Sequence, residues 1–222
     1  FYEGLKTNED DKNLDMSQMI SFAEQIASED DGREVMRRWM DIEEIISYAV
    51  VDRTIRNDDG AFHWYCSTDE ANYGSDCGNH NFYWYSNPST GKVHLIPWDL
   101  DNAFENILFD ANPVTPIADK WGETSNGCKG FAYGEWYLPQ RSAACDKITY
   151  IWSTFEEEFE RLRNEFLQGP FAKEQVDLLL DAWEQQISPV VIEAAEAHDD
   201  ALRFEEWQEA LDVFRRSLAF AR

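Results

Sequence analysis

The spacing of apolar residues, together with the polar residues that interrupt it, predicts helices toward both ends of the chain. Apolar side chains that recur every three or four positions indicate a helix with one buried face. The predicted helices are residues 15–27, 33–39, 42–55, 147–166, 173–197 and 204–220. On the third of them the predicted buried side holds Ile45, Ile46, Ala49, Val50 and Thr54. We expect the fifth to bend near Pro189, because proline lacks the backbone N–H that a helix interior uses.

The middle of the chain predicts a β-hairpin over about residues 81–98. Two apolar stretches are separated there by a gap, residues 86–92, that is rich in turn-forming residues. Asn81 opens the first stretch, and Asp99 and Asp101 follow the second. Because the strands of a hairpin are antiparallel, we expect Asn81 and Asp99 near the same end of it. Amide and carboxylate oxygens gathered at one strand end can hold a hard divalent cation.

The remaining segments decide the fold class. We expect a short strand at 62–65, a polar loop at 66–79 and an irregular stretch at 102–145 that contains several prolines and glycines. The order of helices, hairpin, long loop and helices favours an α+β domain in which a small sheet lies against a largely helical body. A loop-rich stretch of this length inside a compact protein is more often functional than not.

The charge of the chain restricts its partners. The net charge is −25, from 44 acidic and 19 basic residues. We expect no nucleic-acid partner, because phosphates would be repelled. The charge also has an explanation without a specific function, namely the strongly solvated surface of a secreted or salt-adapted protein.

No apolar run is long enough to span a bilayer. The first residues are neither an initiator Met nor a signal peptide, which indicates a processed protein or a fragment. Nothing in the sequence predicts an oligomeric state.

Four cysteines lie in polar loop segments. They form no Cys-x-x-Cys pair, so a zinc site is not predicted. Of the three possible pairings, closeness in sequence favours Cys66 with Cys77 and Cys128 with Cys145. Such disulfides would place the protein outside a reducing cytoplasm. Four free thiols remain the alternative.

Three polar elements are candidates for chemistry, and each also has an ordinary structural explanation. Asp59, in the polar loop after the third helix, could orient or accept a proton from an attacking hydroxyl, or it could be a simple turn residue. Asp99 and Asp101 alternate along an extended segment, so only one of them would face a cleft, and both could simply be solvated. Asn81 alone would be a turn residue. The four histidines lack metal-ligand spacing, and ordinary packing or capping is expected for each.

The order of these elements is an aspartate loop, an asparagine, a hairpin and a second aspartate, which is also the order used by kinase-type phosphoryl-transfer enzymes. At these residues the sequence resembles the CotH kinase family, the group of spore coat protein H. The resemblance covers roughly residues 36–222. It is carried by Asn57-Asp58-Asp59-Gly60, His80-Asn81-Phe82-Tyr83-Trp84-Tyr85, Gly91-Lys92 and Leu95-Ile96-Pro97-Trp98-Asp99-Leu100-Asp101.

The resemblance implies an atypical protein-kinase-like fold and a set of residue roles. Asp59 would take the place of the catalytic aspartate, Asn81 and Asp99 would bind the nucleotide's metal ions, and Asp101 would be a further metal ligand. The implied activity is transfer of the ATP γ-phosphoryl group to Ser or Thr of proteins, with Mg²⁺ or Mn²⁺, and Ca²⁺ as a further candidate. A secreted or cell-surface location is expected.

The same resemblance gives a provisional domain plan. Residues 1–35 would be an N-terminal segment, interpreted as the end of a truncated N-lobe, and residues 36–222 the kinase-like domain. That domain would be mostly the helical C-terminal lobe, with the metal ligands on the small hairpin sheet. Its parts would be a catalytic loop at 56–60, a metal hairpin at 80–102, a loop-rich stretch at 103–145 and helices at 146–222. The alternative function is a catalytically inactive, kinase-like binding module of an extracellular or surface assembly.

Overall fold

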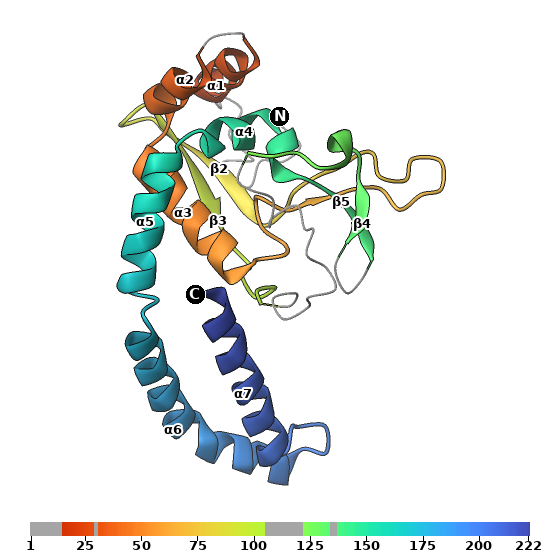
Figure 1. Ribbon diagram of the computed structural model, residues 1–222, viewed down its shortest axis with the longest axis vertical. Helices are drawn as coiled ribbons and strands as arrows, with labels where there is room; N and C mark the ends of the chain where they lie inside the picture. The colour runs from red at the N-terminus through yellow and green to blue at the C-terminus, as the bar shows by residue number, and fades with distance from the viewer. Residues whose placement is uncertain (1–14, 29–30, 105–121, 134–136) are drawn as a thin grey trace.

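The N-terminal helices follow the apolar pattern closely. A computed structural model describes residues 15–28, 31–104, 122–133 and 137–222 (Figure 1). Its first three helices are α1 (Ser17–Ala27), α2 (Gly32–Trp39) and α3 (Ile42–Ile55). Asp31 and Asp41 accept hydrogen bonds from the first backbone N–H groups of α2 and α3, which stabilises these helix starts. The bounds predicted for all three helices are confirmed to within two residues.

Two small antiparallel sheets lie beside these helices. Strands β2 (Phe82–Asn87) and β3 (Lys92–Pro97) form the predicted hairpin, with Phe82 opposite Pro97 and Asn87 opposite Lys92. A second sheet has the order β1–β5–β4, made of β1 (Trp64–Tyr65), β5 (Leu138–Arg141) and β4 (Phe131–Tyr133).

The second sheet corrects two expectations. The segment 102–145 is not wholly irregular, because it contains β4, β5 and two short 3-10 turns. Its strands are three and four residues long, and β5 pairs with β1, which lies more than 70 positions earlier. The strand predicted at 62–65 is limited to Trp64–Tyr65, since Phe62 and His63 lie in a buried turn.

The C-terminal third contains four helices. They are α4 (Lys147–Ser153), α5 (Glu156–Gln168), α6 (Lys173–Ala197) and α7 (Phe204–Ala221). The single helix predicted at 147–166 is therefore wrong. The chain leaves helical geometry at Phe155. Its ring is fully buried, and the guanidinium groups of Arg33 and Arg37 lie 4.3 and 4.9 Å from the ring centroid. The break thus coincides with the burial of this ring.

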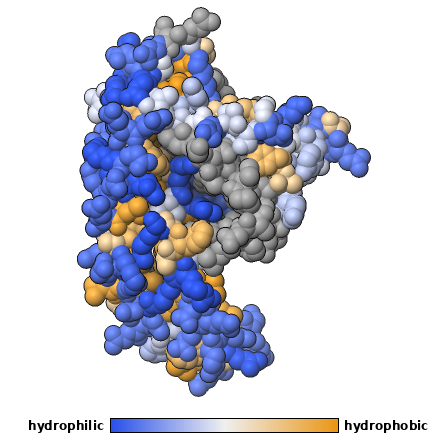
Figure 2. All heavy atoms as spheres, viewed as in Figure 1, coloured by the Kyte–Doolittle hydropathy of each residue, from blue (hydrophilic) through white to orange (hydrophobic). Residues whose placement is uncertain are grey.

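Helices α6 and α7 form an antiparallel pair that extends away from the body (Figure 1). Helix α6 continues through Pro189, and its axis turns in its second half, as expected for an internal proline. The pair shares a small apolar cluster of Phe171, Val176, Leu180 and Leu218. Figure 2 shows apolar patches among the hydrophilic surface of this region. Among the described residues, no helix combines the length and apolar character that a membrane crossing needs.

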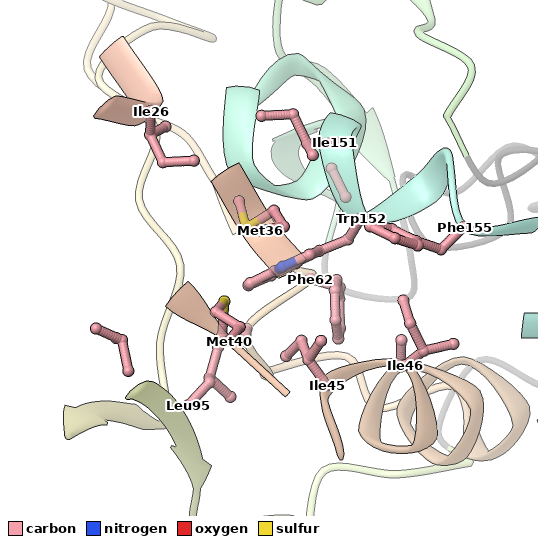
Figure 3. Packing of buried hydrophobic residues seen from close by; sticks show 14 of the residues in the cluster. Ile26, Met36, Met40, Ile45, Ile46, Phe62, Leu95, Ile151, Trp152 and Phe155 are labelled. Carbon is pink, nitrogen blue, oxygen red and sulfur yellow. The ribbon is translucent and has the colours of Figure 1, made fainter. Parts of the chain in front are cut away.

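The main core lies where α1 to α5 meet the hairpin. Trp152 and Phe62 are almost completely buried and contact each other edge to face, with ring centroids 5.8 Å apart. Figure 3 shows Phe62 below Trp152, with Ile45 and Ile46 of α3 beside it. Of the predicted buried side of α3, all positions are confirmed except Thr54, which is half-buried. The fold is thus α+β, with small sheets against a largely helical body.

Both predicted disulfides are present. Cys66 is bonded to Cys77 and Cys128 to Cys145, so no cysteine of the chain is free. The first bond closes the polar loop after β1, and the second joins the segment before β4 to the turn before α4. Since such bonds persist only in oxidising surroundings, they are compatible with a location outside the cytoplasm.

Candidate functional site

The loop that follows α3 is held in shape by buried polar contacts. Arg56 ends the helix in the left-handed conformation, with φ 48°. The next residue, Asn57, is fully buried; its Nδ2 donates to Asp52 Oδ1 at 2.9 Å, and its Oδ1 accepts from the Asp59 backbone N at 3.3 Å. A Cβ at Gly60 would lie 2.4 Å from Asn57 Nδ2 and 2.6 Å from Asp52 Oδ1. Glycine is therefore required there, because any larger residue would collide with this network.

Asp52 is the centre of that network. It is 1% exposed, and its Oδ1 also accepts a hydrogen bond from the Tyr48 hydroxyl at 2.9 Å. Burial raises the pKa of Asp52 to about 7, although hydrogen bonds from Asn57 and Tyr48 oppose the rise. Its Oδ2 is buried without a hydrogen-bond partner in the described part of the chain. Up to nearly neutral pH this carboxyl therefore holds its proton, although the charge of Arg53 also opposes the rise of its pKa.

Asp58 points into the protein rather than toward solvent. Its side chain is 3% exposed and lies 3.8 Å from His63 Nδ1. Burial lowers the pKa of His63 to about 4, and its Nε2 contacts the side chain of Gln140. The imidazole is thus neutral at pH 7, and its approach to Asp58 is not an ion pair there. The backbone N of Asp58 donates to the Asn102 carbonyl at 2.9 Å, which ties this loop to the segment after β3.

Asp59 faces outward and contacts the start of the hairpin. Its side chain is 32% exposed, and its Oδ1 lies 3.3 Å from His80 Nδ1. Asn81 Nδ2 donates to Asp59 Oδ2 at 2.8 Å and to the Asp59 carbonyl at 2.9 Å. Asn81 adopts a left-handed conformation, with φ 57°, which asparagine tolerates better than most residues. Two polar side chains that adjoin β2 therefore orient the Asp59 carboxylate.

The far strand of the hairpin ends at the same place. Trp98 donates from its backbone N to the Asn81 carbonyl at 3.0 Å, which extends the pairing one step beyond β2 and β3. Asp99 follows with φ 55° and is exposed. The prediction that Asn81 and Asp99 lie at one end of the hairpin is confirmed.

Three carboxylates influence one another at this end. Desolvation, followed by the charge of Asp101, a hydrogen bond with Asp101 and the charge of Asp59, raises the pKa of Asp99 above its ordinary value. A carboxyl whose ionisation is opposed by its neighbours is stabilised in its charged form by a cation. The negative charges of Asp59 and Asp101 thus both act on the carboxyl group of Asp99.

The donor set suits a hard cation, but its side chains are not arranged as a finished metal site. In the part of the chain that the structure describes, no group of three or more His, Cys, Asp or Glu side chains could hold a metal ion. The Asn81 amide nitrogen is committed to Asp59. Metal ligation by Asn81, Asp99 and Asp101 therefore stays a prediction. It rests on the type of donor atoms and on the raised pKa of Asp99.

Sequence reasoning missed the residues that support the loop. Asp52 was not singled out, although its spacing of four from Tyr48 places both on one face of α3 and could have indicated the contact. His80 was assigned to ordinary packing or capping, yet it lies beside the Asp59 carboxylate. Its position directly before Asn81 was the available signal. The packing expected for His63 is confirmed by its complete burial.

Comparison with known proteins adds one finding to this geometry. The family model described as CotH kinase protein matches residues 1–218 of the 222 residues. The match also includes residues 1–35, which the motifs alone did not reach. No curated protein and no solved structure matches the chain. Since the family model covers nearly the whole sequence, the chain belongs to the CotH kinase family.

Proposed function

We propose that this protein is a metal-dependent, CotH-type protein kinase that transfers the γ-phosphoryl group of ATP to Ser or Thr of secreted or surface proteins. The observation that supports this most is the meeting of the Asp59 loop with both strand ends of the hairpin, through the Asn81–Asp59 hydrogen bonds and the electrostatic coupling of Asp99 to Asp59. Membership of the CotH kinase family implies a kinase-like fold and is consistent with a kinase-like function.

In this proposal Asp59 receives the substrate hydroxyl. Its carboxylate is exposed enough to be reached, and Asn81 and His80 hold its orientation. A fixed carboxylate can align the hydroxyl with the phosphoryl group and accept its proton. The buried pair of Asn57 and Asp52 fixes the backbone from which Asp59 projects. Removing the Asp59 carboxylate should therefore lower the transfer rate more than it lowers nucleotide affinity.

Asp99, Asp101 and Asn81 would hold Mg²⁺ or Mn²⁺, which supplies positive charge to the nucleotide phosphates. This charge is needed because the protein carries −25 and would otherwise repel ATP. Asp99 and Asp101 would contribute carboxylate oxygens at the end of the hairpin. Desolvation, followed by the charge of Asp101, raises the pKa of Asp99, so a bound cation would favour the ionised pair.

The alternative is a kinase-like binding module without transfer activity. The feature that favours it is the Asn81 amide group, which donates to Asp59 twice and is engaged there rather than at Asp99. The two disulfides suit an extracytoplasmic location under either proposal.

Transfer of radiolabelled phosphate from ATP tests the proposal. Wild type, Asp59→Asn and Asp99→Asn are compared with Mg²⁺ or Mn²⁺, using a general protein substrate and the chain itself. Asp69→Asn, an exposed substitution in the loop after β1, is the control with the same change of charge. We expect the Asp59 and Asp99 variants to lose at least ~100-fold in rate, with the control unchanged. Equal labelling in all four proteins would reject the assignment, and labelling in none would support the binding module.

A further inference from the structure

A cavity of about 360 Å³ lies where the ends of α3 and α7 meet α5. Figure 1 shows the C-terminal end of α7 beside the lower ends of α3 and α5. Four arginines line it, together with two phenylalanine rings: Arg53, Arg56, Arg163, Arg222, Phe159 and Phe220. None of these six residues is among the proposed catalytic or metal-binding residues, although Arg56 begins the candidate catalytic loop.

The concentration of positive charge in this cavity is unusual for this chain. Acidic residues outnumber basic ones 44 to 19 over the sequence, yet the described residues lining the cavity include four guanidinium groups and no carboxylate. Arginine keeps its charge at every physiological pH, so an anion in the cavity would be attracted by these groups. Their gathering here cannot be attributed to an overall excess of basic residues.

Arg222 and Arg56 line the cavity and keep hydrogen-bonding capacity that the described residues do not use. Arg222 donates from Nε to the Phe171 carbonyl at 3.0 Å, but its Nη2 is buried without a hydrogen-bond partner among the described residues. Arg56 lies over the Phe220 ring, 5.5 Å from its centroid, which orients its guanidinium group without satisfying its donors.

Among the described residues, the acidic groups near Arg163 and Arg222 do not balance the charge of these two arginines. Arg163 is 3.9 Å from Glu160, in a pair whose side chains are both more than 40% exposed, and exposed pairs contribute little. Asp52 is close to Arg53 and Asp177 is close to Arg222, but neither carboxylate lines the cavity. An unsatisfied N–H of a charged, buried group is costly, and an anion in the cavity would remove that cost.

We propose that this cavity binds a phosphate-type oxyanion, either free inorganic phosphate or the phosphate monoester of a phosphorylated side chain. Guanidinium groups match the tetrahedral oxygens of phosphate with paired N–H donors, and a dianion offsets more of the fourfold positive charge than one carboxylate does. The phenylalanine rings form an apolar wall that would hold the carbon atoms next to a monoester.

The cavity is connected to the candidate catalytic loop through the chain, because its lining residue Arg56 directly precedes Asn57. A ligand that binds Arg56 therefore contacts the residue that sets the direction of the chain as it enters that loop. The inference does not depend on phosphoryl transfer, since binding can be measured in a protein that transfers nothing.

Isothermal titration calorimetry with sodium phosphate tests the inference. Sodium chloride of equal ionic strength is the reference titrant. We compare wild type with Arg163→Gln and with the double variant Arg56→Gln/Arg163→Gln. Arg161→Gln is the matched control, because Arg161 is on the same helix but pairs with Glu43 and Glu165 outside the cavity. Circular dichroism checks that each variant is folded. If the double variant is unfolded, the phosphate affinity of Arg163→Gln relative to Arg161→Gln is the test.

The expected result is phosphate binding to wild type and to Arg161→Gln, a loss of at least tenfold in affinity in the double variant, and a smaller loss in Arg163→Gln. O-phosphoserine then distinguishes the sources: tighter binding than inorganic phosphate supports a phosphorylated side chain, and equal binding supports free phosphate. Absence of phosphate binding beyond that seen with chloride would overturn the inference, as would an equal loss in Arg161→Gln.

Discussion

Replacing Asp52 with asparagine should change how stability depends on pH. Asp52 is 1% exposed, and burial raises its pKa from 3.8 to about 7. Between these two pH values the folded protein holds a proton on Asp52 that the unfolded chain has released, so the free energy of unfolding falls as pH rises. The size of the fall follows from the two pKa values: about three pH units at 1.36 kcal/mol each is about 4 kcal/mol. Asparagine imitates the protonated carboxyl and should abolish this contribution.

His63 acts in the opposite direction and must be separated from Asp52. Burial lowers its pKa from 6.5 to about 4, so the unfolded chain binds the extra proton, and stability falls as pH drops from 6.5 toward 4. The wild-type profile contains both contributions. The difference between wild type and Asp52→Asn contains only that of Asp52, because His63 is present in both proteins.

Urea unfolding at pH 4, 5, 6, 7 and 8, with the disulfides intact, measures this difference. Relative to wild type, Asp52→Asn should gain about 4 kcal/mol in the free energy of unfolding between pH 4 and pH 8. Asp69→Asn, an exposed control, should gain less than about 0.5 kcal/mol. Parallel profiles for wild type and Asp52→Asn would show that the carboxyl is not protonated near neutral pH and would refute the reasoning.

Two further substitutions test the loop and the disulfides. Gly60→Ala places a Cβ 2.4 Å from Asn57 Nδ2 and should cost about 1–3 kcal/mol in urea unfolding; a variant as stable as wild type would contradict the loop geometry. The unreduced, denatured protein should show no reactive thiol in a colorimetric titration, because all four cysteines are bonded. The double variant Cys66→Ser/Cys77→Ser should lose about 2–3 kcal/mol of stability, and an unchanged midpoint would argue against a constraint on this loop.

Local patterns predicted the elements that depend on local interactions. Helix α3 has its predicted bounds, because its apolar spacing and the cap at Asp41 both lie within a few residues of the element. The hairpin followed from two apolar stretches and a turn. Strands β4 and β5 could not be predicted in this way, since each is very short and their sheet depends on a partner, β1, far away in the sequence.

Tertiary packing decided the remaining differences. The apolar period runs without interruption across 147–166, and the break between α4 and α5 falls at Phe155, whose buried ring contacts Arg33 and Arg37 of α2. On α3 the buried polar residue is Asp52 rather than Thr54, because Tyr48 and Asn57 supply its hydrogen bonds. Neither effect can be seen in periodicity alone.

The sequence predicted the outward-facing residues of the candidate site. It did not predict the residues that hold the catalytic loop and the Asp59 carboxylate in place. The order of motifs identified Asp59, Asn81 and Asp99, and the structure places them around one hairpin end. The inward orientation of Asp58 and the contact of His80 with Asp59 depend on the exact turn after Arg56. Adjacent aspartates in a turn point in different directions, and sequence alone does not say which of the two faces solvent.

The central claim is that the Asp59 loop and the Asp99 end of the hairpin form one phosphoryl-transfer site. Single-turnover transfer rates of wild type, Asp59→Asn, Asp99→Asn and the double variant test it most directly. Residues that act as a unit lose activity non-additively, so the double variant should transfer within about tenfold of the slower single variant. Losses that multiply in the double variant, or single variants as fast as wild type, would contradict the claim.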